Sequence, residues 1–127
     1  MPPHWLLILG LSLLVGTAQG TTPPQIQSSY RAQGANDFSA GRGTTLWVRE
    51  GVKGRHCATC HGAVPSRPGK HARTRKLIDP MALSTSPKRF TDPAKVEKWF
   101  KRNCTWTWGR ECSAQEKGDF LEYLYQL

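Results

Sequence analysis

Apolar residues dominate the start of the chain in a way that is typical of a secretory signal. The run over residues 5–15 is followed by Ala18-Gln19-Gly20, which offers a small-residue cleavage site. A membrane-spanning helix needs about 20 apolar residues, so this run is too short to cross a bilayer. Residues 1–20 are therefore predicted to be a signal peptide that directs the protein to the periplasm. A buried N-terminal helix is the alternative, which Pro2, Pro3 and Gly10 disfavour.

The next stretch, residues 21–35, is polar and contains paired prolines. This composition predicts a flexible N-terminal arm. The folded domain is then expected to cover residues 36–127. Its first helix is predicted over residues 39–50, where Gly43 shares one side with two apolar residues and would let another helix cross closely.

A second helix is expected to begin at Asp92-Pro93, where an aspartate can cap the helix and proline can occupy its first position. Four residues of this helix follow the spacing i, i+3, i+4, i+7 and are predicted to share one face: Val96, Trp99, Phe100 and Asn103. That face is apolar until its last member. A buried asparagine amide needs a partner, because leaving it unpaired costs about 1–3 kcal/mol.

The last helix is predicted to begin at Ser113, since Glu116 three residues later completes a capping box. It would turn Phe120, Leu121 and Leu124 inward. The sequence contains no internal repeat and no strand-like alternation. These patterns predict an all-α domain.

The segment Cys57-Ala58-Thr59-Cys60-His61 adds a specific chemistry to this helical pattern. Cys-x-x-Cys-His is the attachment motif of a c-type haem, in which both thiols bond the porphyrin and the histidine becomes the proximal iron ligand. A zinc ribbon would require a second cysteine pair at similar spacing. One covalently attached haem c is therefore predicted, with Cys57, Cys60 and His61 as its attachment and ligand residues.

Cys104 and Cys112 remain after the haem motif is assigned. An even remainder in an exported protein indicates a disulfide. Eight residues of continuous helix would separate the two cysteines by roughly 12 Å, so a bridge requires a chain reversal, for which Gly109 is the natural place. Two free thiols are the alternative.

The residue opposite His61 decides the function, and spacing alone favours Met81. Thioether ligation is common in electron-carrying cytochromes, although a methionine can also simply fill space in a core. Asn103 ranks second, as a weak and easily displaced ligand. His71 lies in a basic loop, and His56 is too close to the haem motif to reach over the ring.

Composition adds a basic surface and a small core to this description. The net charge is +9, and residues 1–20 contain no charged side chain. Eight cations fall between residues 49 and 76 against one acid, Glu50: Arg49, Lys53, Arg55, Arg67, Lys70, Arg73, Arg75 and Lys76. This patch could steer an acidic redox partner to the haem or simply keep the protein soluble. Nucleic-acid binding does not fit an exported protein. Removal of residues 1–20 leaves 107 residues, a small core that a haem would complete.

From residue 77 to the C-terminus the sequence resembles the Sphaeroides haem protein family of monohaem c-type cytochromes. The matching segments are Ile78-Asp79-Pro80-Met81, Lys88-Arg89-Phe90-Thr91-Asp92-Pro93, Lys95-Val96-Glu97-Lys98-Trp99-Phe100, Arg102-Asn103-Cys104, Gly109-Arg110-Glu111-Cys112 and Gln115-Glu116-Lys117. The combination of Asn-Cys, a second cysteine eight residues later and one haem motif is specific. The run Arg73-Thr74-Arg75-Lys76 and the segment Trp106-Thr107-Trp108 depart from the expected pattern.

The resemblance implies a fold like that of a class I cytochrome c, with Asn103 as the sixth ligand and a Cys104–Cys112 disulfide beside it. It also implies that the asparagine leaves on reduction, so that the ferrous haem binds oxygen or another diatomic ligand. The family's redox partners are a dihaem cytochrome c and a membrane b-type cytochrome. The expected function is therefore a ligand-labile exported cytochrome, and an ordinary carrier with His61 and Met81 as ligands is the alternative. No spacing requires a distal acid–base pair, so no enzymatic reaction is assigned.

Overall fold

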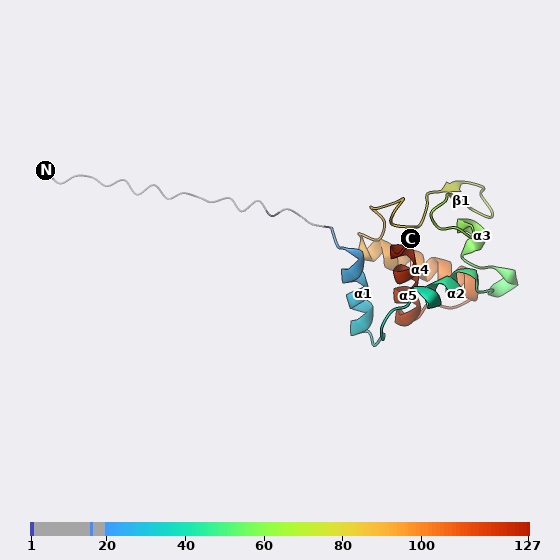
Figure 1. The fold of residues 1–127 in the computed structure, drawn as a ribbon, viewed down its shortest axis with the longest axis horizontal. Helices are drawn as coiled ribbons and strands as arrows, with labels where there is room; N and C mark the ends of the chain where they lie inside the picture. Colours follow the sequence, from blue (N-terminus) through green and yellow to red (C-terminus); the bar gives the residue numbers. More distant parts are fainter. Residues whose placement is uncertain (2–15, 17–19) are drawn as a thin grey trace.

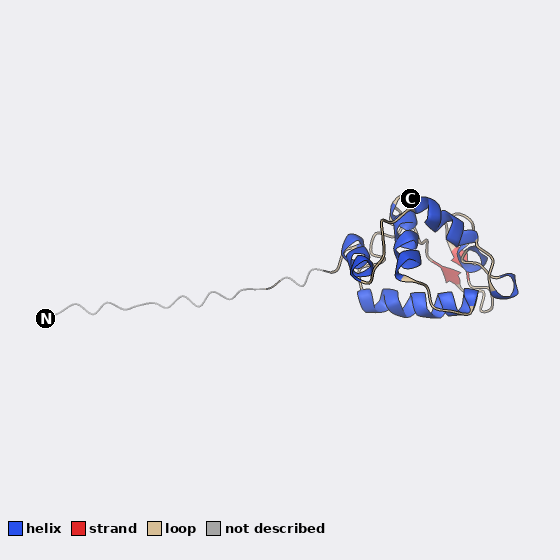
Figure 2. Ribbon diagram, turned by 90° about the horizontal axis from the view of Figure 1, so that it is seen from below, coloured by secondary structure: helices blue, strands red, loops and turns tan. Residues whose placement is uncertain are grey.

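Helices dominate the computed structural model, which describes residues 1, 16 and 20–127 (Figure 2). In chain order the elements are α1 (Pro23–Ala32), α2 (Ala40–Val48), the 3-10 helix η1 (Val52–Gly54), α3 (Ala58–His61), β1 (Gly69–Lys70), β2 (Leu77–Ile78), α4 (Pro93–Trp108) and α5 (Ala114–Tyr125). Figure 1 shows α1 at one end of the domain, α3 and β1 at the other, and α5 between them. Most of the predicted signal peptide lies outside the described residues. No helix in the described part is long and apolar enough to span a membrane.

Side-chain caps begin three of the helices at the positions that the sequence predicts. Ser39 Oγ accepts the Arg42 N–H of α2, at 3.2 Å. Asp92 Oδ1 accepts the Lys95 N–H of α4, at 3.1 Å, and Pro93 follows as the first helical residue. Ser113 and Glu116 form the expected capping box of α5. Each cap pairs a backbone N–H that has no partner inside its own helix.

Helix α5 is the centre of the domain and packs against both α1 and α2. Its crossing with α2 occurs at Gly43, where a β-carbon would stand 2.2 Å from the carbonyl oxygen of Asp119. The Asp119 carboxylate is buried there and accepts hydrogen bonds from Ser39 N–H and from the Arg42 guanidinium. Phe120, Leu121 and Leu124 are buried, as predicted.

The prediction of a flexible arm over residues 21–35 is wrong, because most of it is helix α1. Pro23 and Pro24 open the helix, where their missing N–H groups cost nothing. Ile26 and Tyr30 lie one turn apart and are 3% and 0% exposed, packed with Val96 and Leu121. The two apolar residues of an otherwise polar segment therefore anchor it to the domain.

The predicted inner face of α4 also needs correction, because Trp99 points outward and Asn103 is exposed rather than buried. The Trp99 side chain is 46% exposed, and the Arg102 guanidinium lies 5.1 Å from its ring centroid. The face that packs inward instead contains Val96, Cys104 and Thr107, which are buried, and the partly buried Phe100. The helix is rotated from the expected orientation because Cys104 faces the core with Cys112.

The loop between the haem motif and α4 contains a small ladder that the sequence did not predict. Strands β1 and β2 pair antiparallel, with Gly69 opposite Ile78 and Lys70 opposite Leu77. Each strand has only two residues, too few for an alternating pattern to appear. The ladder holds the predicted loop against α3.

Candidate haem site

A cavity lies between α3 and the facing sides of α2, α4 and α5. It encloses about 670 Å³ of empty space, part of it open to solvent. Its walls are mostly apolar and aromatic: Trp47, His56, Cys57, Cys60, His61, Met81, Phe90, Phe100, Asn103, Cys104, Trp106, Thr107, Trp108, Phe120 and Leu124. The structure thus brings the predicted haem motif and both candidates for the sixth ligand to one cavity. His71 does not line it, whereas His56 does.

One wall of the cavity is the haem motif itself. Cys57 immediately precedes α3, and Cys60 and His61 lie in its single turn. The two cysteines are free thiols that are not bridged to each other. Burial raises the pKa of the Cys57 thiol to about 12. Both cysteines line the cavity as free thiols.

The surroundings of His61 lower its pKa and contact its ring. Burial, and to a lesser extent the positive charge of Arg89, lowers the pKa of His61 to about 4. The imidazole is thus neutral near pH 7, the form that binds a metal. Its Nδ1 is buried and has no hydrogen-bond partner among the described residues. The Trp47 ring lies 5.5 Å from the imidazole, centroid to centroid, and Trp47 Nε1 donates to the carbonyl of Gly62.

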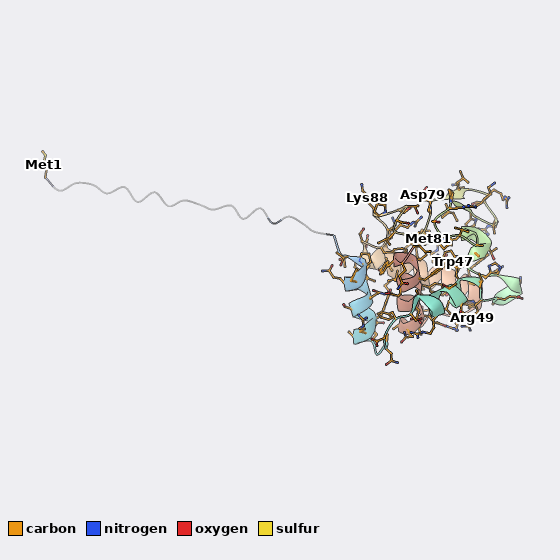
Figure 3. All side chains as sticks on the ribbon, viewed as in Figure 1. Met1, Trp47, Arg49, Asp79, Met81 and Lys88 are labelled. Atoms are coloured by element: carbon orange, nitrogen blue, oxygen red, sulfur yellow. A yellow bond between two sulfur atoms is a disulfide. The ribbon has the colours of Figure 1, made fainter. Side chains whose placement is uncertain are left out.

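The loop that carries Met81 is fixed from two directions. The Met81 N–H donates to the carbonyl of Pro65, at 2.8 Å. The Arg89 guanidinium donates to the carbonyls of Pro80 and Asp79, at 2.6 and 2.7 Å. Figure 3 shows Met81 and Trp47 in the same part of the domain. Phe90, beside Arg89, also lines the cavity and holds a left-handed backbone conformation (φ 60°) that is uncommon for an aromatic residue.

The wall formed by α4 contains Asn103 and the disulfide. The structure joins Cys104 to Cys112 by a disulfide whose Cα atoms lie 5.6 Å apart. Gly109, at φ 69°, ends α4 in the left-handed conformation and reverses the chain between the two cysteines. Asn103 precedes the buried Cys104, so the bridge restrains the backbone beside the Asn103 amide.

Two tryptophans of α4 close the wall next to Asn103, and arginines lie over both. The Arg55 guanidinium lies 4.3 Å from the Trp106 ring centroid, and Arg49 lies 5.2 Å from that of Trp108. Trp108 also stacks on Phe120, with ring centroids 5.9 Å apart. The sequence marks Trp106 and Trp108 as an aromatic departure from the family pattern. Sequence reasoning missed the cavity role of Phe90 and Phe120, which only the tertiary fold reveals.

The basic surface surrounds the haem motif as the sequence suggests. Residues 51–78 contain no acidic side chain. Of the eight cations between residues 49 and 76, only Arg49 forms a salt bridge within the described part of the chain, with Glu116. The Ala72 N–H donates to Cys60 Sγ, at 3.3 Å, so this basic loop touches the haem motif directly. Its charge is therefore unneutralised and next to the cavity.

These features fit a covalently attached haem c. The chain supplies two unbridged thiols, a neutral imidazole whose buried Nδ1 has no hydrogen-bond partner among the described residues, and a largely apolar cavity. Cys57 and Cys60 would hold the porphyrin, and His61 would bind its iron. Met81 and Asn103 both line the cavity as possible further ligands.

Comparisons with known proteins identify relatives among the c-type cytochromes. A family model described as "Domain of unknown function (DUF1924)" matches residues 33–124. Cytochrome c-type protein SHP of Cereibacter sphaeroides is 42% identical over 111 residues, which cover 84% of this chain and 85% of the relative. Cytochrome c'' of Methylophilus methylotrophus is 44% identical over 68 residues, covering 54% of this chain and 47% of the relative.

Solved structures extend the similarity to three dimensions. Oxidized SHP, described as an oxygen-binding cytochrome c, superposes with a TM-score of 0.79 at 40% identity and covers 85% of this chain and 99% of its own. Oxidized cytochrome c'' from M. methylotrophus gives a TM-score of 0.70 at 34% identity, over 80% of this chain and 91% of its own. These matches confirm the expected cytochrome c fold and covalent haem. The chain therefore belongs to the DUF1924 family and is a monohaem cytochrome c of the SHP type.

Proposed function

We propose that this protein is an exported cytochrome whose sixth haem ligand, Asn103, is labile, so that a diatomic ligand such as oxygen binds at the ferrous haem. A bound haem c supplies a redox-active iron with His61 on one side and a second axial position on the other. Export to the periplasm rests on the predicted signal peptide, residues 1–20. Electron exchange with partner cytochromes completes the proposal.

The observation that carries this proposal is the position of Asn103 in the cavity wall beside the disulfide. An amide is a weak ligand of haem iron. The neighbouring wall consists mostly of aromatic and apolar side chains, which do not form hydrogen bonds with the Asn103 amide. The Cys104–Cys112 bridge fixes the backbone to which Asn103 is attached. Two relatives add support, because SHP is described as oxygen binding and the solution structure of cytochrome c'' concerns haem-ligand detachment.

A second candidate function is ordinary one-electron transfer with His61 and Met81 as ligands. Met81 also lines the cavity, and its backbone is fixed by Pro65 and by the contacts of Arg89 with the preceding residues. A thioether ligand would keep the iron low-spin and unreactive toward carbon monoxide. The two functions therefore predict opposite spectra.

The proposed partners are a dihaem cytochrome c and a membrane b-type cytochrome. The exposed cations of residues 51–78 support an acidic docking partner, since charges of one sign raise the encounter rate with a partner of the opposite sign. The association rate with such a partner should fall as salt screens these charges. A rate independent of ionic strength would contradict docking on this surface.

The deciding experiment records absorption and resonance Raman spectra of the anaerobically reduced holoprotein, before and after addition of carbon monoxide. Asn103→Ala and Met81→Leu are matched variants, since each removes one candidate ligand. We expect high-spin ferrous haem that binds carbon monoxide at once, and an oxidised spectrum changed by Asn103→Ala but not by Met81→Leu. Low-spin ferrous haem that ignores carbon monoxide, with a spectrum changed by Met81→Leu, would establish the carrier function instead.

A further inference from the structure

Trp106 occupies a boundary between solvent and the cavity. Its side chain lines the cavity and is nevertheless 40% exposed. It follows Asn103 by three residues on α4, so the two side chains are neighbours on the helix surface. A ligand that approaches Asn103 along this side of α4 therefore passes close to Trp106.

Arg55 holds Trp106 in this position through two separate contacts. Its guanidinium lies 4.3 Å from the centroid of the indole ring, and its Nη1 donates a hydrogen bond to the Trp106 carbonyl, at 3.0 Å. Cation–π contacts of this kind favour one orientation of the ring. Arg55 is followed by His56 and Cys57, which also line the cavity, so it ties this wall to α4.

Trp99 provides an internal comparison on the same helix. It is similarly exposed, at 46%, and an arginine, Arg102, also lies over its ring, at 5.1 Å. Trp99 does not line the cavity. The helix therefore carries two exposed tryptophan–arginine pairs, of which only one contacts the site.

We propose that Trp106, held by Arg55, controls the rate at which a ligand enters the cavity beside Asn103 and the size of the ligand that can enter. The inference rests on the proposed function in one respect, that an exogenous ligand binds on the Asn103 side. It goes further in naming the side chain that sets access. Because Arg55 holds the indole in place, removing the Arg55 guanidinium should raise the rate of ligand entry even though Trp106 itself is unchanged.

The test measures carbon monoxide association by flash photolysis of the ferrous holoprotein, and imidazole binding to the ferric holoprotein. The variants are Trp106→Ala, Trp106→Phe, Arg55→Gln and the control Trp99→Ala. Trp106→Ala should raise the carbon monoxide association rate about tenfold, equivalent to a barrier lower by about 1.4 kcal/mol, and should admit the larger imidazole. Trp106→Phe and Arg55→Gln should give smaller increases, and Trp99→Ala should give none.

The same variants in an Asn103→Ala background separate this inference from the proposed function. If wild type rejects carbon monoxide but Asn103→Ala binds it and Trp106→Ala accelerates that binding, labile ligation fails and the access role stands. Equal rates for Trp106→Ala, Arg55→Gln and wild type in both backgrounds would overturn the access role. No carbon monoxide binding in any variant would overturn both. Arg55→Gln changes only a partly exposed side chain, so it remains informative if Trp106→Ala does not fold.

Discussion

Gly69 of β1 lies directly against the carbonyl oxygen of Cys60 in the haem motif. A β-carbon on Gly69 would stand 2.3 Å from that oxygen and 2.7 Å from the Cα of His61. Both neighbours are backbone atoms of α3, so neither can rotate away. The small ladder of β1 and β2 therefore supports the haem motif through a contact that only glycine allows.

Gly69→Ala should displace α3 and destabilise the holoprotein by about 1–3 kcal/mol, the usual range for overpacking. The free energy of unfolding by denaturant and the haem content of the purified protein would measure the effect. Gly41→Ala in α2 is the control, because its nearest neighbour would be Ser39 Oγ at an ordinary 3.5 Å. Equal stability of the two variants would show that the contact with Cys60 is not tight in solution.

The caps of α4 and α5 could be predicted from the sequence because they depend on local chemistry. Asp92-Pro93 and the Ser113–Glu116 box act within one turn of their helices. The outward orientation of Trp99 could not be predicted in this way. The packing of Cys104 toward Cys112 sets the rotation of α4, and that constraint comes from tertiary structure.

Helix α1 was missed although local signals for it exist. The Thr22 N–H donates to Gln25 Oε1, the contact of a capping box, and Pro23 suits the first position of a helix. Only Ile26 and Tyr30 mark its apolar side, which is too few for a clear period. The burial of these two residues depends on Val96 of α4 and Leu121 of α5, which lie far away in the sequence.

Tyr30→Ala should lower the free energy of unfolding by about 3–5 kcal/mol, as for other large aromatic residues deleted from a core. Tyr30 is fully buried and donates a hydrogen bond to Glu97 Oε1, at 2.5 Å. Ser28→Ala on the exposed side of α1 is the matched control and should change stability by less than about 0.5 kcal/mol. A stability loss for Tyr30→Ala no larger than that of Ser28→Ala would instead support a flexible arm over residues 21–35.

Removal of the disulfide in Cys104→Ala/Cys112→Ala should cost about 2–3 kcal/mol of stability, because a short loop is no longer closed in the unfolded chain. It should also alter carbon monoxide binding, since Asn103 is attached to the same backbone as Cys104. Denaturant unfolding and flash photolysis report the two effects separately. A destabilised variant with wild-type binding kinetics would show that the bridge stabilises the fold without tuning Asn103.

The position of the sixth ligand marks the limit of sequence reasoning at the site. The motif at residues 57–61 predicts haem attachment by spacing alone. Met81 and Asn103 are far apart in sequence, and the fold brings both to the cavity. Which of them binds depends on distances to a haem iron, so the choice stays a prediction that the spectra decide.

Glu116 ties the disulfide turn to two helices. Its carboxylate accepts two hydrogen bonds from Arg110, at 2.7 and 2.8 Å, and one from the Ser113 N–H, at 2.9 Å. Arg49 of the segment after α2 lies 3.4 Å away. The pKa of Glu116 is lowered from 4.5 to about 2, chiefly by the hydrogen bonds from Arg110. The hydrogen bond from the Ser113 N–H and the charges of Arg110 and Arg49 lower it further.

Because the folded-state pKa lies below the unfolded value, the ionised carboxylate stabilises the folded protein above pH 4.5 and loses this effect as the pH falls toward 2. Wild type should therefore be more stable than Glu116→Gln at pH 7, and the difference should shrink at pH 3. Thermal unfolding of both holoproteins at the two pH values measures it, and acid effects shared by both cancel in the comparison. Glu111→Gln is the control, because Glu111 pairs with Lys101 on an open surface where both side chains are mostly exposed. A pH-independent difference between wild type and Glu116→Gln would show that the carboxylate charge does not stabilise the turn.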